Sequence, residues 1–247
     1  MRNNSKRLLA AGACALAFGQ SLPAQAAIAL DRTRVVVDGG QRSVSLSVSN
    51  ENKQLPYLAQ GWIEDSAGRK ISHPLTVLPP VQRIEPGARS QVRIQPLPDI
   101  DTLPQDRESL YYFNLREIPP RTDKPNTLQL ALQTRIKLFY RPRALRVDKS
   151  AAPWQEQMTL VRSGGGWRLT NPTPYYITIV DGSDRPGGAS AAGFRPLMLD
   201  PRSSATLPAS GLGASPVLTY INDYGGRPQL QFVCADSLCR AKPVKDK

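Results

Sequence analysis

The sequence predicts an all-β protein made of two domains in tandem. The first observation is the run Leu128–Tyr140, in which apolar and polar side chains alternate as in an extended strand. The second is a series of short strand-like segments, separated by turns rich in Gly, Pro, Asn and Asp, without a convincing helix. The third is length, because about 220 residues beyond the N-terminal segment suit two domains of about 100 residues.

The run Leu128–Tyr140 is the most regular element of the sequence. Every second residue from Leu128 is apolar except Thr134. A helix would also collect an apolar stripe, but it would leave Leu130 and Leu138 on its polar side. Because β-branched and aromatic residues end the run, we expect one strand of 13 residues, longer than the usual strand of about 5 to 6.

The residues before this run predict the other strands of a first domain. We expect strands over Ala29–Val37, Val44–Val48, Tyr57–Glu64, Arg89–Gln95 and Leu110–Arg116. Pro79-Pro80 excludes a regular central strand at that point. The number and spacing of these strands are typical of an immunoglobulin-like β-sandwich, although the cysteine pair of antibody domains is absent from the sequence.

A second β series follows a linker. The alternation fades after Pro142, so we place the first domain at residues 27–147 and the second at residues 148–247. Strands are expected over Met158–Val161, Trp167–Thr170, Tyr175–Val180, Leu197–Leu199, Val217–Asn222 and Gln229–Cys234. Residues 185–193 are rich in Gly, Ala and Ser and are expected to form a flexible loop.

Residues 1–26 are typical of a secretory signal peptide. Basic residues precede a short apolar stretch from Leu8 to Phe18, and Ala24-Gln25-Ala26 is a small-residue pattern that predicts cleavage after Ala26. Cys14, preceded by Ala-Gly-Ala, leaves a lipoprotein signal open as an alternative with a shorter apolar core. Since no run approaches 18 apolar residues, we expect a soluble exported protein.

The charge of the chain does not by itself identify a partner. Removal of residues 1–26 lowers the formal net charge from +12 to +9, because this segment holds three basic and no acidic residues. A basic excess can indicate nucleic-acid binding, but the basic residues are scattered among acidic ones and export separates the protein from nucleic acid. We expect no nucleic-acid partner; an anionic protein partner remains open.

The cysteines predict a local disulfide. Only Cys234 and Cys239 remain after the signal segment, and an oxidising compartment favours their pairing. A metal site would need two further soft ligands, and the only histidine, His73, is distant in the sequence. We therefore expect neither a metal site nor a cofactor.

The sequence lacks the constellations that support catalysis. His73 has no Ser-Asp or Cys partner near it, and the glycines at residues 164–166 lack the Lys-Ser/Thr of a phosphate loop. Glu64 and Asp65 are consecutive, so they point to opposite faces of a strand. We expect no catalytic residues and a binding protein rather than an enzyme.

Motifs in both predicted domains resemble those of the periplasmic pilus-assembly chaperones. They are Leu30-Asp31-Arg32-Thr33-Arg34, Asn50 to Gln60, Pro79 to Arg83, Asp106 to Leu110, Tyr112 to Pro120, Lys137 to Pro142, Asn171 to Tyr176 and Tyr220 to Pro228. The resemblance covers nearly all of the chain after the signal segment. It implies a periplasmic protein of two immunoglobulin-like domains, arranged as a boomerang with an interdomain cleft.

The resemblance also implies a function and its partners. Chaperones of this family lend a strand to a pilus subunit that lacks the last strand of its own sandwich, and an outer-membrane usher then receives the subunit. Leu128, Leu130 and Leu132 would form this donor strand and fill the groove of the subunit. The residues alone leave open that these leucines belong to the chain's own core. A self-capping dimer is a further partner that the resemblance leaves open.

Two basic residues match the family's anchor for the C-terminal carboxylate of the subunit. Arg34 would offer a planar fork and Lys137 a point charge, and each would make charge-assisted hydrogen bonds. Strict alternation puts Lys137 on the face opposite the three leucines. We therefore expect a bulge or twist near residues 133–135, or a lysine that reaches round the strand.

Three further residues, Glu108, Arg141 and Asp223, match a salt-bridge network between the domains of this family. Such a network would hold the angle of the cleft without contacting the subunit. Solvated charges of small energetic effect remain the alternative for these three residues and for the two anchor residues.

Two other functions remain open from the sequence. The chain could be an exported structural or adhesive fimbrial protein, which would polymerise and carry an incomplete sandwich. It could also be a carbohydrate-binding module, but Trp62, Trp154 and Trp167 lie in separate segments and are more typical of core positions.

Overall fold

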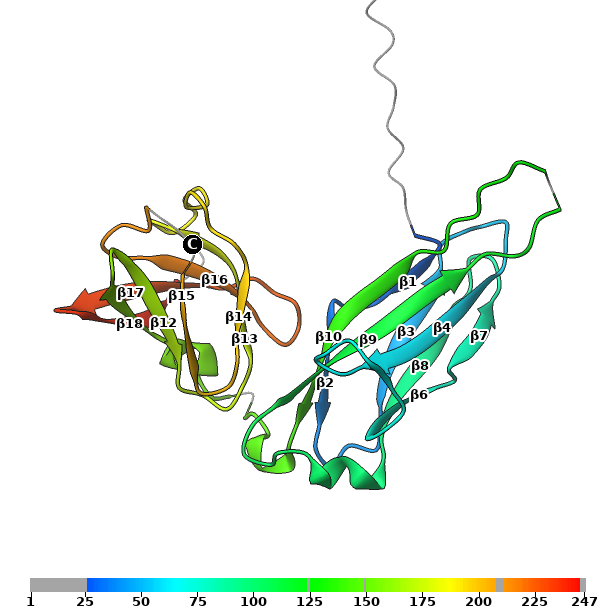
Figure 1. Ribbon diagram of the computed structural model, residues 1–247, viewed down its shortest axis with the longest axis horizontal. Helices are drawn as coiled ribbons and strands as arrows, with labels where there is room; N and C mark the ends of the chain where they lie inside the picture. Colours follow the sequence, from blue (N-terminus) through cyan, green and yellow to red (C-terminus); the bar gives the residue numbers. More distant parts are fainter. Residues whose placement is uncertain (1–25, 124, 149, 208–210, 245–247) are drawn as a thin grey trace, which may run out of the picture.

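The structure is a computed structural model that describes residues 26–123, 125–148, 150–207 and 211–244. Two β domains meet at an angle, and the boomerang shape that the resemblance implied is visible in Figure 1. The nearly all-β, two-domain fold predicted from the sequence is thereby confirmed. The proposed signal peptide lies almost entirely outside the described residues. Within them, no helix has the length and apolar character needed to cross a membrane.

The first domain consists of two packed sheets. One sheet has the order β1 (Ile28–Leu30), β3 (Val44–Asn50), β8 (Arg89–Pro96) and β6 (Leu75–Leu78). The other has the order β2 (Arg34–Asp38), β10 (Gln133–Arg141), β9 (Ser109–Ile118), β4 (Tyr57–Glu64) and β5 (Lys70–Ile71), with β7 (Val81–Ile84) also paired to β4. Alternating apolar residues such as Leu46, Phe113 and Leu138 meet between the sheets, where they are fully buried.

Two predictions for this domain need correction. The single strand expected over Ala29–Val37 is two strands, β1 and β2, because the chain crosses from one sheet to the other between Leu30 and Arg34. The sequence analysis also missed β6 and β7, which are four residues each and flank the Pro79-Pro80 pair that interrupts the hydrogen-bonding pattern.

The second domain is one sheet that curls around its own core. Its strands are β11 (Thr159–Ser163), β12 (Gly166–Asn171), β13 (Ile177–Ser183), β14 (Leu197–Leu199), β15 (Ser203–Thr206), β16 (Val217–Ile221), β17 (Gln229–Ala235) and β18 (Leu238–Pro243). Their spatial order is β14-β13-β16-β17-β18-β11-β12-β15, and the two end strands lie near each other. The core contains Met158, Leu169 and Phe232.

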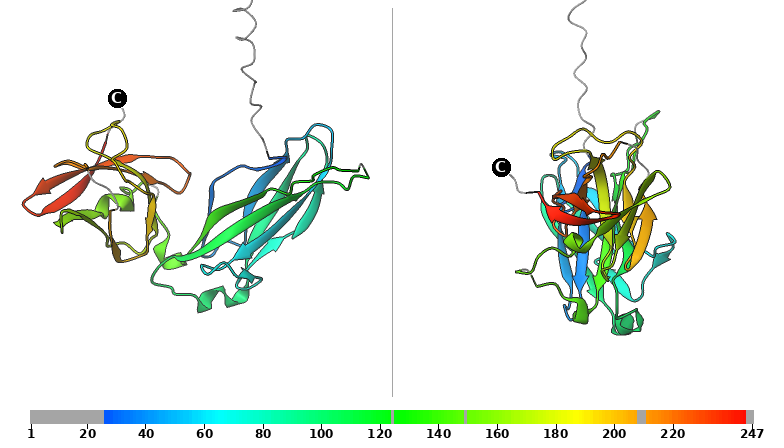
Figure 2. Two further views of the ribbon diagram at one scale, coloured as in Figure 1. Left: turned by 45° about the horizontal axis from the view of Figure 1, so that its top comes forward. Right: turned by 90° about the vertical axis from the view of Figure 1, so that its left-hand side faces the viewer.

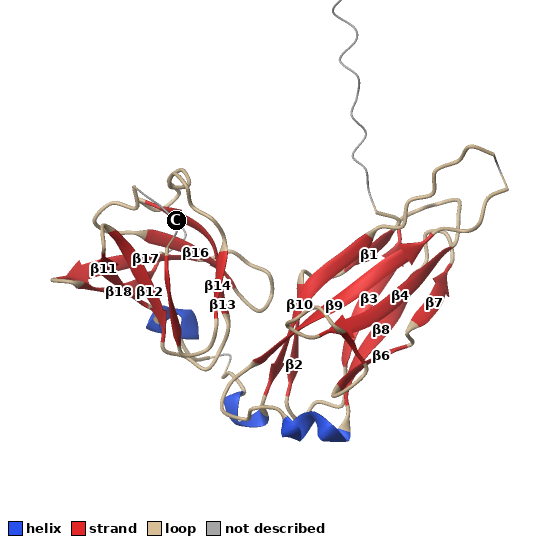
Figure 3. Ribbon diagram, in the orientation of Figure 1, coloured by secondary structure: helices blue, strands red, loops and turns tan. Residues whose placement is uncertain are grey.

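The sequence correctly predicted most strands of the second domain and its disulfide. β15 and β18 were missed, the first because it is short and polar. Cys234 and Cys239 form the predicted disulfide, which joins β17 to β18. Short 3-10 helices lie in the connections, as Figure 3 shows: η1 (Pro98–Thr102), η2 (Arg143–Leu145) and η3 (Trp154–Gln157).

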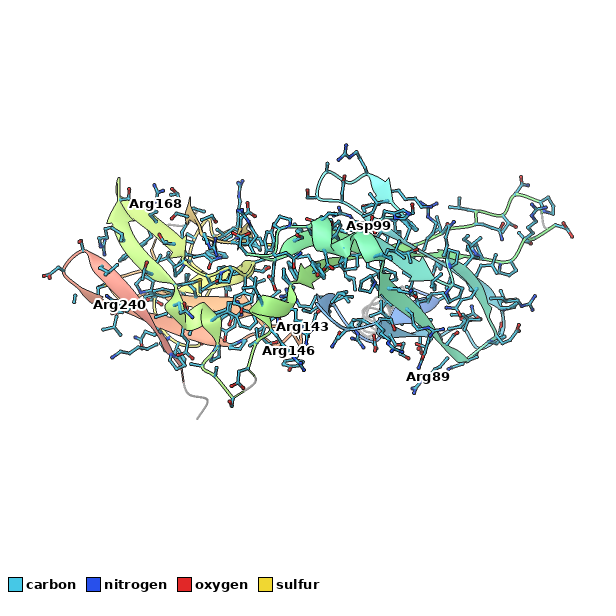
Figure 4. The ribbon with its side chains drawn as sticks, turned by 90° about the horizontal axis from the view of Figure 1, so that it is seen from below. Arg89, Asp99, Arg143, Arg146, Arg168 and Arg240 are labelled. Atoms are coloured by element: carbon cyan, nitrogen blue, oxygen red, sulfur yellow. A yellow bond between two sulfur atoms is a disulfide. The ribbon has the colours of Figure 1, made fainter. Side chains whose placement is uncertain are left out.

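Two features of the fold determine where the candidate site lies, namely the connection between the domains and the segment between β9 and β10. The connection between the domains runs through η2, and Arg143 and Arg146 lie near the middle of the molecule in Figure 4. The segment between β9 and β10 projects from the end of the first domain that is remote from the second domain, as Figures 1 and 2 show. β10 therefore runs from an outer tip toward the domain interface.

Candidate functional site at the domain interface

β10 has a strand on both sides over only half of its length. β9 pairs antiparallel with residues 133–140, whereas β2 pairs in parallel only with residues 137–141. On the β2 side, residues 133–136 therefore have no strand beside them within the described part of the chain. An open edge of this kind offers N–H and C=O groups to an added strand.

The three predicted donor leucines lie directly before this open edge. Leu128, Leu130 and Leu132 are 82 %, 64 % and 46 % exposed, so they do not belong to the chain's own core. The expected strand of 13 residues is wrong in its first part, because β10 begins at Gln133 and residues 128–132 are irregular. The carbonyl of Leu132 accepts a hydrogen bond from the Glu117 N–H at 3.0 Å, which ties the end of this segment to β9.

The two predicted anchor residues lie where the open edge ends. Lys137 and Arg34 are opposite each other in the register of β10 and β2. Arg34 Nη1 donates to the carbonyl of Ile221 at 3.1 Å, and Lys137 Nζ donates to Thr178 Oγ1 at 3.0 Å. Thr178 and Ile221 are themselves opposite each other in β13 and β16 of the second domain. A residue pair of one domain thus meets a residue pair of the other.

Both cations are withdrawn from solvent without an anionic partner. Arg34 is only 8 % exposed, and its Nε has no hydrogen-bond partner; Lys137 is half-buried. Burial lowers the pKa of Lys137 to about 8, and the nearby charge of Arg34 acts in the same direction. Burial also lowers the pKa of Arg34, whereas the negative charges of Asp223 and Glu108 raise it. Neither residue takes part in the ion pairs found among the described residues.

The bulge expected near residues 133–135 is absent. β10 keeps one register with β9 from Gln133 to Tyr140. Ile136 and Leu138 point into the core, while Lys137 and Phe139 lie on the other face, which is turned toward the second domain. Regular alternation therefore already directs the lysine to the interface. The leucines impose no conflict, because their segment is not part of the strand.

The predicted network residues also come together at this interface. Arg141 Nε donates to Glu108 Oε1 at 2.8 Å, and Arg141 Nη1 donates to Asp223 Oδ2 at 2.9 Å. Glu108 Oε2 accepts from the Tyr176 N–H at 2.8 Å. Burial raises the pKa of Glu108 to about 7, although Arg141 and the Tyr176 N–H act in the opposite direction. The Arg141 guanidinium also lies 5.0 Å from the centroid of the Trp154 ring.

The sequence analysis missed some residues of this interface. Thr178 is a buried hydroxyl between two isoleucines, and nothing in the sequence shows that it faces Lys137. Arg202 of the second domain bonds Asp106 of the first at 2.7 Å. The recognised motif from Asn171 to Tyr176 marked this region without assigning those contacts.

Comparison with known proteins places both domains in one family of sequences. Residues 27–146 match the family model described as "Pili and flagellar-assembly chaperone, PapD N-terminal domain", and residues 153–232 match "Pili assembly chaperone PapD, C-terminal domain". The chain is 53 % identical over 223 residues to the "Chaperone protein PapD" of Escherichia coli, an alignment that covers 90 % of this chain and 92 % of that protein.

Solved structures show the same fold. The crystal structure of the periplasmic chaperone SfaE is 32 % identical with a TM-score of 0.66, over 83 % of this chain and 98 % of that chain. The SafB chaperone of Salmonella enterica in complex with the SafA pilin gives 27 % identity and a TM-score of 0.70, over 84 % of this chain and 96 % of that chain.

Proposed function

Because the chain belongs to the PapD-like family of pilus-assembly chaperones, we propose that it binds, folds and caps pilus subunits by donor-strand complementation. The observation that carries this proposal is an open strand edge that ends at two cations, neither of which belongs to an ion pair of the described residues. A subunit that lacks one strand would complete its sandwich along residues 128–136, and its exposed groove would receive Leu128, Leu130 and Leu132.

The geometry also favours one direction for the added strand. β2 occupies the edge of β10 from Lys137 onward, so a guest strand must end where Arg34 begins β2. A C-terminal carboxylate reaches that point only if the guest runs from residue 133 toward residue 137, parallel to β10. The carboxylate would then face Arg34 and Lys137, which form charge-assisted hydrogen bonds worth about 1.5 to 3 kcal/mol each.

The leucines and the two cations contribute to the free energy of binding in different ways. Burial of each leucine contributes about 1.5 to 3 kcal/mol before the entropic costs of association. These apolar contacts tolerate a shift of the guest by two residues, whereas the carboxylate has one place to bind. The cations therefore set the register, and the leucines supply most of the area.

We infer an exported periplasmic protein whose signal peptide is cleaved after Ala26, which delivers subunits to an outer-membrane usher. Its action is non-enzymatic and needs no cofactor or metal. In the absence of subunit, the same open edge could be covered by a second copy of the chain as a self-capping dimer. The fimbrial-subunit and carbohydrate-binding alternatives are not retained, since the family is one of chaperones.

Co-expression with a candidate subunit tests the proposal. The wild-type chain should copurify with the subunit from the periplasm, while Arg34→Ala and Lys137→Ala should each lower the recovered complex at least tenfold. Arg168→Ala serves as a matched control, because Arg168 is also a strand cation but is exposed in the second domain on β12 (Gly166–Asn171). Undiminished complexes with both anchor variants would contradict the anchor assignment.

A further inference from the structure

Glu117 is a buried carboxylate that the proposed function does not use. It lies in β9 and is only 6 % exposed. Its side chain accepts a hydrogen bond from the backbone N–H of Ile28 at 2.9 Å through Oε2. Among the ion pairs of the described residues, none includes Glu117. One amide donor compensates only part of the cost of burying a charge.

The position of this carboxylate is close to the start of the mature chain. Ile28 begins β1, is 3 % exposed and pairs with Asn50 of β3. The carbonyl of the residue before it, Ala27, accepts a hydrogen bond from the Glu51 N–H at 2.7 Å. β1 is an edge strand of three residues, so these few contacts hold it in place.

Cleavage after Ala26 would change the chemistry at this point. Hydrolysis of the Ala26–Ala27 peptide bond consumes one water, leaves a carboxylate on Ala26 and leaves an α-ammonium group on Ala27. The nitrogen of Ala27 is one residue from the Ile28 nitrogen that already donates to Glu117, and consecutive residues are less than about 4 Å apart. An amide with one N–H thus becomes a cation with three, one residue away from the amide that bonds a buried carboxylate.

We propose that Glu117 is the binding site for the α-ammonium group of the processed N-terminus. The proposal rests on the cleavage site proposed above. The pair would fix β1 on the edge of its sheet only after the signal peptide is removed, because the precursor has no positive charge at Ala27. Glu117 is also the residue whose N–H bonds the Leu132 carbonyl, so the same residue supports the base of the donor segment.

A set of four proteins tests this site. Chains that begin at Ala27 or, with one additional residue, at Ala26 are released from a fusion without extra residues, each with Glu117 or with the substitution Glu117→Gln. Glutamine keeps an acceptor for the Ile28 N–H and removes only the charge. With Glu117, the additional residue should raise the unfolding equilibrium constant, measured in urea, by about tenfold. In the E117Q variant, the constants of the two chains should differ by less than about twofold, because no carboxylate is left to bind the ammonium group.

Glu51 provides the matched control for Glu117. Glu51→Gln removes an exposed carboxylate near the same N-terminus and should leave the tenfold effect intact. An additional residue that costs the same stability with Glu117 and with E117Q would overturn the proposal. If E117Q does not fold, transamination of the Ala27 chain provides a second test, because it converts the α-amine to a carbonyl and spares the lysines. It should raise the unfolding constant by about tenfold, as the additional residue does. An unchanged unfolding constant would overturn the proposal.

Failure of the cleavage proposal is recognised separately. The intact mass of the protein exported with its own leader shows whether the mature chain begins at Ala27. A different N-terminus would contradict the cleavage site, while the four purified proteins still report on whether Glu117 binds an ammonium group at Ala27.

Discussion

Arg141 and Lys137 lie on β10 and Arg34 lies on the neighbouring β2, and all three face the second domain, but what compensates the charge of Arg141 differs from what compensates the other two. Arg141 is held by Glu108 and Asp223 at 2.8 to 2.9 Å. Within the part of the chain that the structure describes, Arg34 and Lys137 belong to no ion pair, and their hydrogen bonds go to a carbonyl and a hydroxyl. The first arrangement is complete without a ligand and joins two domains. The second gains a missing anion when a carboxylate arrives, which distinguishes a structural cation from a binding site.

The largest effect is expected from breaking the completed arrangement. Arg141→Met should lower the free energy of unfolding by about 3 to 5 kcal/mol, because Glu108 is left as a buried carboxylate without its cation. Urea denaturation measures this change. A loss below about 1 kcal/mol would show that the network is not a structural support of the interface.

An intermediate effect is expected from pH, through Lys137. Its pKa of about 8 in the free chain lies below the usual lysine value, and a bound carboxylate would raise it again. Subunit affinity should therefore change little between about pH 5, where the guest carboxylate is still ionised, and pH 8, and it should fall above pH 8 by no more than about tenfold per pH unit. Titration calorimetry at pH values on both sides of this pKa measures the affinity for the subunit.

The folded free chain should respond to pH in the opposite sense. Its Lys137 loses a proton near pH 8, while the unfolded chain keeps that proton to about pH 10.5. The burial cost of the lysine is thus present below pH 8 and relieved as pH rises toward 10.5. Lys137→Met should remove both dependences; an affinity that still falls at alkaline pH in this variant would assign the titration to another group.

The smallest effect is expected from removing the unpaired cation Arg34. Arg34→Met keeps an apolar stem near the Phe139 ring and removes a buried charge that belongs to none of the ion pairs among the described residues. The free energy of unfolding should change by less than about 1 kcal/mol or rise. Urea denaturation of Arg34→Met and Arg141→Met compares their free energies of unfolding. Equal losses in the two variants would contradict the distinction between a structural cation and a binding cation.

Local patterns in the sequence predicted features that depend on nearby residues. The alternation of Tyr57–Glu64 corresponds to β4, and the spacing of Cys234 and Cys239 corresponds to a hairpin disulfide. Arg34 and Lys137 came from the family resemblance, and the structure brings them opposite each other. Their pairing across the chain could not be derived from spacing, because β2 and β10 are about 100 residues apart.

The features that prediction missed depend on which strands lie side by side. Alternation in residues 128–132 indicated a strand, but a ladder also needs a partner, and no strand pairs with them in the described part of the chain. The chain crosses between the sheets from Leu30 to Arg34, and the polar residues in between do not show which sheet each flanking strand joins. The contact of Thr178 with Lys137 depends on the angle between the two domains. Each is a long-range property that local patterns do not encode.

The most direct test uses a synthetic peptide that copies the C-terminal strand of a pilus subunit, prepared once with a free carboxylate and once as an amide. Binding to the purified chain is measured by titration calorimetry near neutral pH. We predict that the free acid binds at least tenfold more tightly than the amide, and that Arg34→Met or Lys137→Met removes most of this difference. Equal affinity of the two peptides for the wild-type chain would contradict this prediction.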